Sequence, residues 1–308
     1  MTILITHDDA DAHATPPGHP EQVARRRAVL DALSDLDLDR RDARDCPDAA
    51  ILRCHPQSHL DALAAAEPAE PAGGAAQLDP DTWMAPGSLR AARLAAGGAV
   101  QAVDAVLAGE DRTAFVAMRP PGHHAERARA MGFCLLGTVA IAARHALDHH
   151  GLERVAVVDF DVHHGNGTQD LLWDEGRAMF VSTHQSPLWP GTGAAEETGA
   201  HGQVVNLPLP PGSDGDAFRD ALESVLPRLR DFAPDLVLIS AGFDAHADDP
   251  LAGLEWGEDD FVWATRELVA LARESARGRV VSVLEGGYDL RALGASARAH
   301  VTALMEGS

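Results

Sequence analysis

Val155-Ala-Val-Val-Asp-Phe-Asp-Val-His-His-Gly-Asn-Gly-Thr168 is the stretch that decides the fold. Its first four residues are all apolar, as in a strand that is covered on both faces of a sheet. Ionisable residues follow at once, and Gly165 and Gly167 then break the extended pattern. Ionisable groups at the end of a buried strand are costly unless they are used. The stretch therefore predicts a central strand of a parallel sheet with a functional site at its carboxyl end.

Asp159, Asp161 and His163 fall on one side of this strand if its extended geometry continues, because side chains alternate between faces. A carboxylate and an imidazole two residues apart can hold one metal ion together. Zinc accepts both ligand types, and a catalytic zinc ion has three protein ligands and an open position for water. The pattern predicts a metal site whose third ligand comes from elsewhere in the chain. The alternative is a polar turn whose acids cap the next helix.

Strand-like and helix-like patterns alternate along the whole chain. Strands are expected at residues 2–6, 49–53, 113–118, 155–158, 178–182, 204–207, 235–240 and 279–284. Helices are expected at residues 18–33, from 55 onward with Ser58 as its cap, and at 88–107, 135–149, 214–231, 258–276 and from 289 onward. Residues 67–87 are rich in Pro, Gly and Ala and predict a surface loop. The alternation predicts an α/β fold, with a mainly parallel sheet between helices.

The length of 308 residues fits one large α/β domain over residues 1–308, with two small domains as the alternative, and 45% hydrophobic residues are enough for a folded core. No run of eighteen apolar residues is present, so no membrane span is expected. Residues 2–6 are too few for the apolar part of a signal peptide. The three cysteines form an odd set without CxxC spacing, which predicts a reducing, cytoplasmic location.

The formal net charge is −22, and all 25 basic residues are arginine. A nucleic-acid partner would need a basic face to contact phosphates, so this acidity argues against one. It can attract cationic substrates, or serve only for solubility.

Polar clusters follow several of the expected strands. They contain His123 and His124, Asp161 and His163, His184, Asp244, and Tyr288. Ligand sites of parallel α/β sheets lie beyond the carboxyl ends of their strands, so we expect these clusters to meet.

These motifs together resemble the zinc-dependent histone deacetylase superfamily, in particular its class II branch, with the bacterial histone deacetylase-like amidohydrolases and the acetylpolyamine amidohydrolases. The matching stretches keep the family's order: Arg119-Pro-Pro-Gly-His-His-Ala, Gly132-Phe-Cys, Asp159-Phe-Asp-Val-His-His-Gly-Asn-Gly-Thr-Gln, Ser182-Thr-His-Gln, Pro190-Gly-Thr-Gly, Ser240-Ala-Gly-Phe-Asp-Ala-His, Asp249-Pro-Leu and Glu285-Gly-Gly-Tyr. Weaker matches are His19-Pro-Glu and Asp81-Thr-Trp. The resemblance implies the single-domain fold shared with arginases, with a parallel sheet of about eight strands.

The resemblance implies a metal centre in which Asp161, His163 and Asp244 hold one Zn²⁺ per chain. Two carboxylates and one imidazole suit zinc and leave room for water and a carbonyl oxygen. Asp159, Ser182 and backbone carbonyls near the ligands are implied to hold a structural K⁺.

The catalytic roles are implied in the same way. His124 takes a proton from water and protonates the leaving amine, and His123 acts mainly through its charge. Asp159 orients His123. Asn166 faces His124 and leaves it less basic than an aspartate would. Tyr288 donates its hydroxyl to the oxyanion.

A narrow tunnel for a linear chain is expected between Phe133 and Trp189. Gly132 and Gly287 are expected to border it, and Leu251 stands where polyamine-specific relatives carry a glutamate.

The resemblance therefore implies hydrolysis of an acyl amide on a primary amine, with acylated lysine or a small acylated amine such as an acetylpolyamine as substrate. An arginase-like enzyme with two manganese ions and a catalytically inactive binding protein are the alternatives. An arginase-like enzyme would need further carboxylates that bridge its two metal ions. An inactive binding protein would be expected to have lost one of the metal ligands. A homo-oligomer is left open.

Overall fold

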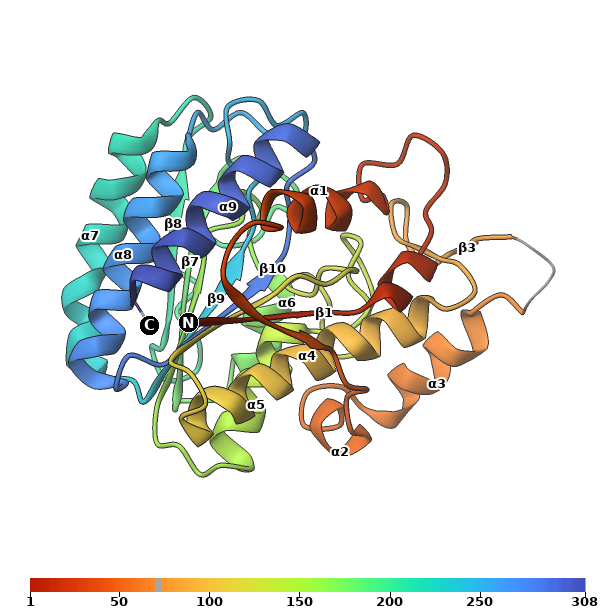
Figure 1. The fold of residues 1–308 in the computed structure, drawn as a ribbon, viewed down its shortest axis with the longest axis horizontal. Coiled ribbons are helices and arrows are strands. Elements are labelled where there is room, and N and C mark those ends of the chain that lie inside the picture. The colour runs from red at the N-terminus through yellow and green to blue at the C-terminus, as the bar shows by residue number, and fades with distance from the viewer. Residues whose placement is uncertain (70–73, 308) are drawn as a thin grey trace.

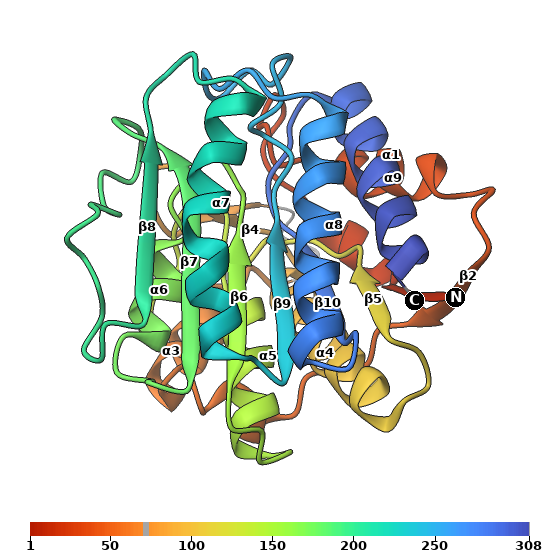
Figure 2. The same cartoon turned by 90° about the vertical axis from the view of Figure 1, so that its left-hand side faces the viewer.

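The computed structural model describes residues 1–69 and 74–307. Part of the loop expected at 67–87, and the last residue of the expected domain, therefore lie outside the described residues. Figures 1 and 2 show helices on both faces of one twisted sheet.

The sheet has eight strands in the order β2-β1-β5-β10-β9-β6-β7-β8, and neighbouring strands are parallel throughout. This confirms the expected parallel α/β architecture. The strands are β1 (Thr2–Thr6), β2 (Leu38–Asp42), β5 (Thr113–Val116), β6 (Val155–Asp159), β7 (Ala178–Gln185), β8 (Val204–Leu209), β9 (Leu236–Ala241) and β10 (Val280–Leu284). Figure 2 shows β9 and β6 near the middle of the sheet.

The helices form two layers, each with its own apolar core. One layer contains α2 (Asp48–Ile51), α3 (Gln57–Ala66), α4 (Ser88–Ala108), α5 (Thr138–Asp148) and α6 (Asn166–Leu172). The other contains α1 (Ala24–Ala32), α7 (Gly215–Phe232), α8 (Glu258–Ser275) and α9 (Leu290–Gly307). A short 3₁₀ helix, η1 (Asp8–Ala12), packs against α4.

Strand β6 shows why an unbroken apolar run forms here. Val155 and Val157 belong to the core under one helix layer, whereas Ala156 and Val158 belong to the core under the other. All four side chains are essentially inaccessible to solvent. Because both faces of the strand are covered, both sets of alternating positions must be apolar.

Helix α4 is long and apolar enough to cross a membrane by composition alone, with a mean hydropathy of 1.2. Within this fold, 78% of that window is buried against the sheet and its neighbouring helices. Its hydropathy is thus accounted for by packing in the core.

The structure corrects several expected elements. The strand expected at 49–53 is wrong, because Asp48–Ile51 is the short helix α2. Ser58 is not a cap, since α3 begins after Pro56 without a side-chain capping bond. Helix α1 begins only at Ala24. The loop at 67–87 carries a two-stranded antiparallel sheet, and edge strand β2 and helix α6 were not expected at all.

Candidate active site

Four neighbouring strands carry the candidate site. The loops that follow β5, β10, β9 and β6 supply, in that order, the His123–His124 pair, Tyr288, Asp244, and Asp161 with His163. Because the strands are parallel, their carboxyl ends meet at one edge, and side chains far apart in the sequence converge there.

Asp161, His163 and Asp244 form a compact group whose ligand atoms lie within 4.8 Å of one another. His163 Nδ1 lies 3.2 Å from Asp161 Oδ1 and 3.1 Å from Asp244 Oδ2. Both carboxylates are buried, and His163 is 9% exposed. The structure thus brings together the three residues expected to bind a metal, including Asp244 as the third ligand from elsewhere in the chain.

The charges of this group fit a metal ion. Burial and the like charge of Asp161 raise the pKa of Asp244. Burial alone would lower the pKa of His163, but its bonds to the two carboxylates raise that pKa to about 10. Without a metal, a proton on His163 therefore holds two buried carboxylates together. A divalent cation bound by the same oxygen and nitrogen atoms would neutralise them more fully, and the donor set matches that of catalytic zinc.

Two glycines let the carboxylates approach the bare backbone. A Cβ atom at Gly242 would lie 2.0 Å from Asp161 Oδ2, and one at Gly286 would lie 2.2 Å from Asp244 Oδ2. The backbone N–H of Gly286 instead donates to Asp161 Oδ2 at 2.8 Å. Asp244 Oδ1 likewise accepts a bond of 2.9 Å from the Val162 N–H. Each carboxylate is thereby held in one orientation.

His123 is buried beside two carboxylates. Its Nδ1–H donates to Asp159 Oδ2 at 3.0 Å, and its Nε2 lies 3.7 Å from Asp161 Oδ2. Burial lowers the pKa of His123, but Asp161 and Asp159 outweigh it and raise the pKa well above its usual value. His123 is therefore suited to carry a positive charge, and Asp159 lies where it was expected.

His124 has the opposite character. Burial, then the neighbouring His123 and His163, hold the pKa of His124 well below its usual value. Its Nδ1 lies 2.7 Å from Asn166 Oδ1, and the Asn166 amide is oriented by donating to Glu126 Oε1 at 2.9 Å. Because Asn166 presents its oxygen, Nδ1 of His124 carries the proton and Nε2 keeps a free lone pair. His124 is thus a neutral base.

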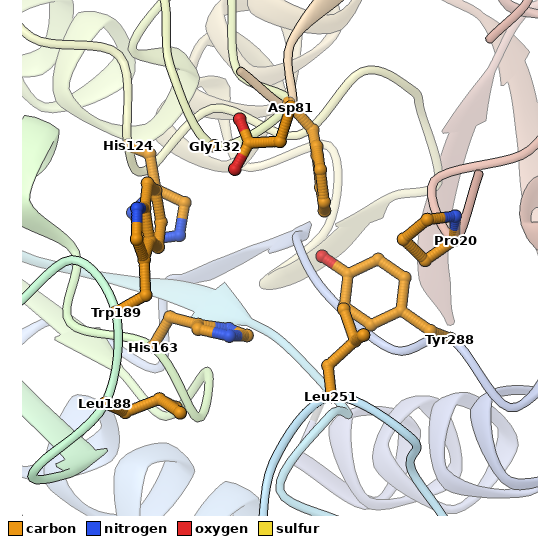
Figure 3. A pocket seen from close by; sticks show the side chains of 10 residues that line it. Pro20, Asp81, His124, Gly132, His163, Leu188, Trp189, Leu251 and Tyr288 are labelled. Atoms are coloured by element: carbon orange, nitrogen blue, oxygen red, sulfur yellow. The ribbon is translucent and has the colours of Figure 1, made fainter. Parts of the chain in front are cut away.

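A narrow pocket of about 230 Å³ leads to His163 (Figure 3). In Figure 3 the Tyr288 hydroxyl points into this pocket, across from His124 and Trp189. The pocket is lined by Pro20, Asp81, His124, Gly132, Phe133, His163, Leu188, Trp189, Leu251 and Tyr288. Four of the five expected tunnel residues are among them.

Gly287 is the exception, because it is not among the residues that line the pocket. A Cβ atom there would meet Leu293 and Phe243, so this residue faces the α9 side. Its carbonyl accepts a 2.6 Å bond from Arg25 Nε, and its φ of 116° favours glycine.

Gly132 does border the pocket. Its φ is 56°, and a Cβ atom would lie 2.5 Å from both the His124 ring and the Trp189 ring. Any side chain at this position would collide with the His124 and Trp189 rings.

We expect Gly132→Ala to lower kcat/KM about tenfold or more, because the methyl group displaces His124 or Trp189 and the positive φ costs about 1–2 kcal/mol. Steady-state kinetics of amide hydrolysis would measure this. Gly109→Ala is the matched control, since Gly109 has a φ of 76° with open space around it. Equal losses in both variants would show that backbone strain alone is responsible.

Tyr288 is held from three sides. Its backbone N–H donates to Asp249 Oδ2 at 2.7 Å, the Arg25 guanidinium lies 4.8 Å from its ring centre, and Phe133 packs edge-on at 5.8 Å. Burial raises the pKa of Tyr288 well above its usual value, so the phenol stays protonated. Within the described residues its hydroxyl has no hydrogen-bond partner, and it is free to donate to a ligand.

Sequence reasoning missed several residues of the site. Pro20, Asp81 and Leu188 line the pocket. Glu285 accepts bonds from the N–H groups of Gly122, at 2.6 Å, and His123, at 3.1 Å, and so fixes the histidine loop. The weak matches His19-Pro-Glu and Asp81-Thr-Trp could have signalled the first two, but only the tertiary fold places Glu285 under the loop.

The position implied for potassium is partly formed. Asp159 and Ser182 are paired neighbours on β6 and β7. The Ser182 hydroxyl bonds to His184 Nδ1 at 2.9 Å, and Asp159 Oδ1 accepts from the Asp161 N–H at 3.0 Å. Both side chains are therefore already paired within the protein.

Comparison with known proteins agrees with this geometry. The histone deacetylase domain family matches residues 19–304. The chain is 42% identical over 276 residues to the histone deacetylase-like amidohydrolase of Pseudomonas aeruginosa, covering 87% of this chain and 71% of that protein. It is 36% identical over 305 residues to a probable deacetylase of Archaeoglobus fulgidus, covering 94% and 82%. The crystal structure of the HDA15 HD domain matches with a TM-score of 0.92 and 33% identity, covering 99% of this chain and 88% of that one, which confirms the expected arginase/deacetylase-like fold. By sequence and by fold, this chain belongs to the histone deacetylase family.

Proposed function

We propose that this chain is a zinc-dependent amidohydrolase that removes an acetyl or other acyl group from an acylated primary amine. One observation carries the proposal. The buried Asp161–His163–Asp244 group lies at a narrow pocket that also presents the His124 base and the Tyr288 hydroxyl. The potassium ion implied by the resemblance is not part of the proposal, because Ser182 is already bonded to His184, and Asp159 to His123 and the Asp161 N–H.

Asp161, His163 and Asp244 would hold the zinc ion, which when bound supplies a Lewis acid for the amide carbonyl and for water. His124 Nε2 takes a proton from a water molecule as the water oxygen adds to the carbonyl carbon. The same proton passes from His124 to the amine nitrogen as the C–N bond breaks. Carboxylate and free amine leave. His123, kept positive by Asp161 and Asp159, stabilises the negative charge that develops nearby.

Tyr288→Phe removes one hydroxyl and leaves the packing of the ring intact. If that hydroxyl donates to the oxyanion, we expect kcat to fall by roughly 10²–10³-fold with little change in KM. The bond strengthens only as negative charge grows on the oxygen, so the ground state loses little. Steady-state assays over a range of substrate concentrations measure both kcat and KM. A rise in KM alone would make Tyr288 a binding residue only.

The shape of the pocket supports a linear substrate. Its cavity is smaller than the roughly 300–1,000 Å³ of sites for drug-sized ligands. Asp81 places a carboxylate at the lining, where a cationic amine of a small substrate or of a basic peptide would be attracted. Leu251, in contrast, supplies no charge on the opposite wall.

The decisive experiment compares kcat/KM for acetyl-lysine peptides, N-acetylputrescine, N-acetylcadaverine and longer acyl-lysines. Hydrolysis of any of them that is abolished by chelation supports the proposal, and the ranking identifies the substrate class. Asp81→Asn should lower kcat/KM selectively for the cationic acetylated diamines. Release of urea from arginine, with two manganese ions per chain, would instead indicate the arginase-like alternative.

A further inference from the structure

A second group of metal-ligating side chains lies away from the pocket. His145 and His149 are one turn apart on α5 and at its end, and His150 follows directly. One ring nitrogen from each lies within 4.8 Å of the others. Asp104, near the end of α4, faces the same group, and the two helices pack side by side (Figure 1).

The position of this histidine cluster separates it from the active site. Helix α5 leads into the amino end of β6, whereas Asp161 and His163 follow its carboxyl end. The five residues of β6 span about 16 Å between the two edges of the sheet. The cluster therefore contributes nothing to the candidate catalytic group.

The hydrogen bonds of the cluster leave nitrogen lone pairs without partners. His145 Nε2 and His150 Nε2 both lie 2.7 Å from Asp104 Oδ1. Each neutral ring that donates there keeps an unprotonated Nδ1. His145 is only 6% exposed, and its Nδ1 is buried without any hydrogen-bond partner. A buried, unpaired acceptor is costly, and a bound cation would relieve that cost.

The rings are already close to a chelating arrangement. His145 and His149 stack with centroids 4.7 Å apart, and His150 stands edge-on to both, at 5.1 and 4.9 Å. Two histidines at positions i and i+4 of a helix can bind one zinc ion from the same face. Ligand nitrogens around tetrahedral zinc lie about 3.3 Å apart, so the exposed rings of His149 and His150 need only turn inward.

We propose that His145, His149 and His150 form a second site, which binds one transition-metal dication of the zinc, nickel or copper class. Imidazole nitrogens select these ions over magnesium or calcium. Asp104 orients two of the ligands through their other ring N–H groups, as carboxylates commonly do for metal-binding histidines. The net charge of −22 favours cation binding in general. The bound ion ties the end of α5 and the loop before β6 to α4.

The test counts bound metal in full-length protein that has been stripped with a chelator and dialysed against Zn²⁺. Wild type is expected to bind two ions per chain, His149→Ala and His150→Ala one, and Asp244→Ala one. The double variant with Asp244→Ala and His149→Ala should bind none. Asp104→Asn should weaken the second site about tenfold or more. His201→Ala, a change at an exposed histidine elsewhere, should still bind two.

The outcomes separate this site from the catalytic one. His149→Ala protein that binds as much Zn²⁺ as wild type, with the same affinities, would overturn the proposal whatever Asp244→Ala does. Loss of one ion in His149→Ala with unchanged binding in Asp244→Ala would support the second site and refute the catalytic one. Nickel should raise the melting temperature of wild type by more than that of His149→Ala, which keeps only the Asp161–His163–Asp244 group. His149→Ala and His150→Ala should both keep wild-type kcat/KM once zinc is restored.

Discussion

Asp244→Ala is expected to lose one bound zinc ion and essentially all activity, on the order of 10⁴-fold or more, because water without the metal is a far weaker acid and nucleophile. The remaining Asp161 and His163 supply only two of the three protein ligands that catalytic zinc requires. Metal analysis and kcat/KM measured on the same preparation test both parts together.

Asp248→Ala provides the matched control for that result. Asp248 is an exposed carboxylate four residues away that pairs with Arg291, so its loss should change neither metal content nor turnover. Asp244→Ala also leaves the buried Val162 N–H without its acceptor, and a melting curve would show whether the fold survives. Full zinc content with normal activity in folded Asp244→Ala protein would refute the ligand assignment.

His124→Ala should lower kcat by about 10²–10⁴-fold while zinc content stays unchanged, since it removes a general acid–base group that is not a ligand. The assignment rests on its low pKa and on the proton held at Nδ1 by Asn166. Turnover close to that of wild type would overturn the role given to His124.

Asn166→Asp tests the same base without removing it. A carboxylate beside Nδ1 stabilises the imidazolium form, so it raises the pKa of His124. As the pH falls, His124 is then protonated at a higher pH than in wild type. The acidic limb of the profile of kcat/KM against pH should therefore move to higher pH. Asn166 would be only a packing residue if this limb kept its wild-type position.

Much of the fold could be predicted from local patterns. The central strand β6 is apolar at its first four positions because helices cover both faces, and such a run is visible without any tertiary contact. Edge strand β2, with the sequence Leu-Asp-Arg-Arg-Asp, has a neighbour on one side only; its first residue is buried, and the others alternate between partly exposed and exposed positions. Arg41 pairs with Asp39 and Glu110, and Arg40 donates to the Leu33 carbonyl, so this strand lacks the apolar pattern that would have predicted it.

The short helix α2 illustrates the opposite error. Its apolar residues Ala50 and Ile51 resemble a strand by composition, but Pro47 starts a helical turn that packs against α5. Four residues are too few to distinguish a helical from an extended period, so the tertiary contact decides.

The sequence alone determined the chemistry available to the site. Each candidate site residue follows a buried strand: Asp161, His163, Asp244, the His123–His124 pair and Tyr288. Parallel strands bring their carboxyl ends to one edge of the sheet. Only the tertiary structure decided which side chains face one another. Asp81 and Leu188 enter the pocket, Gly287 turns away from it, and α4 meets α5 so that Asp104 reaches a histidine cluster. The physical reason is that local periodicity selects elements and buried faces, whereas the packing angle and the loop path between elements set contacts across long sequence separations.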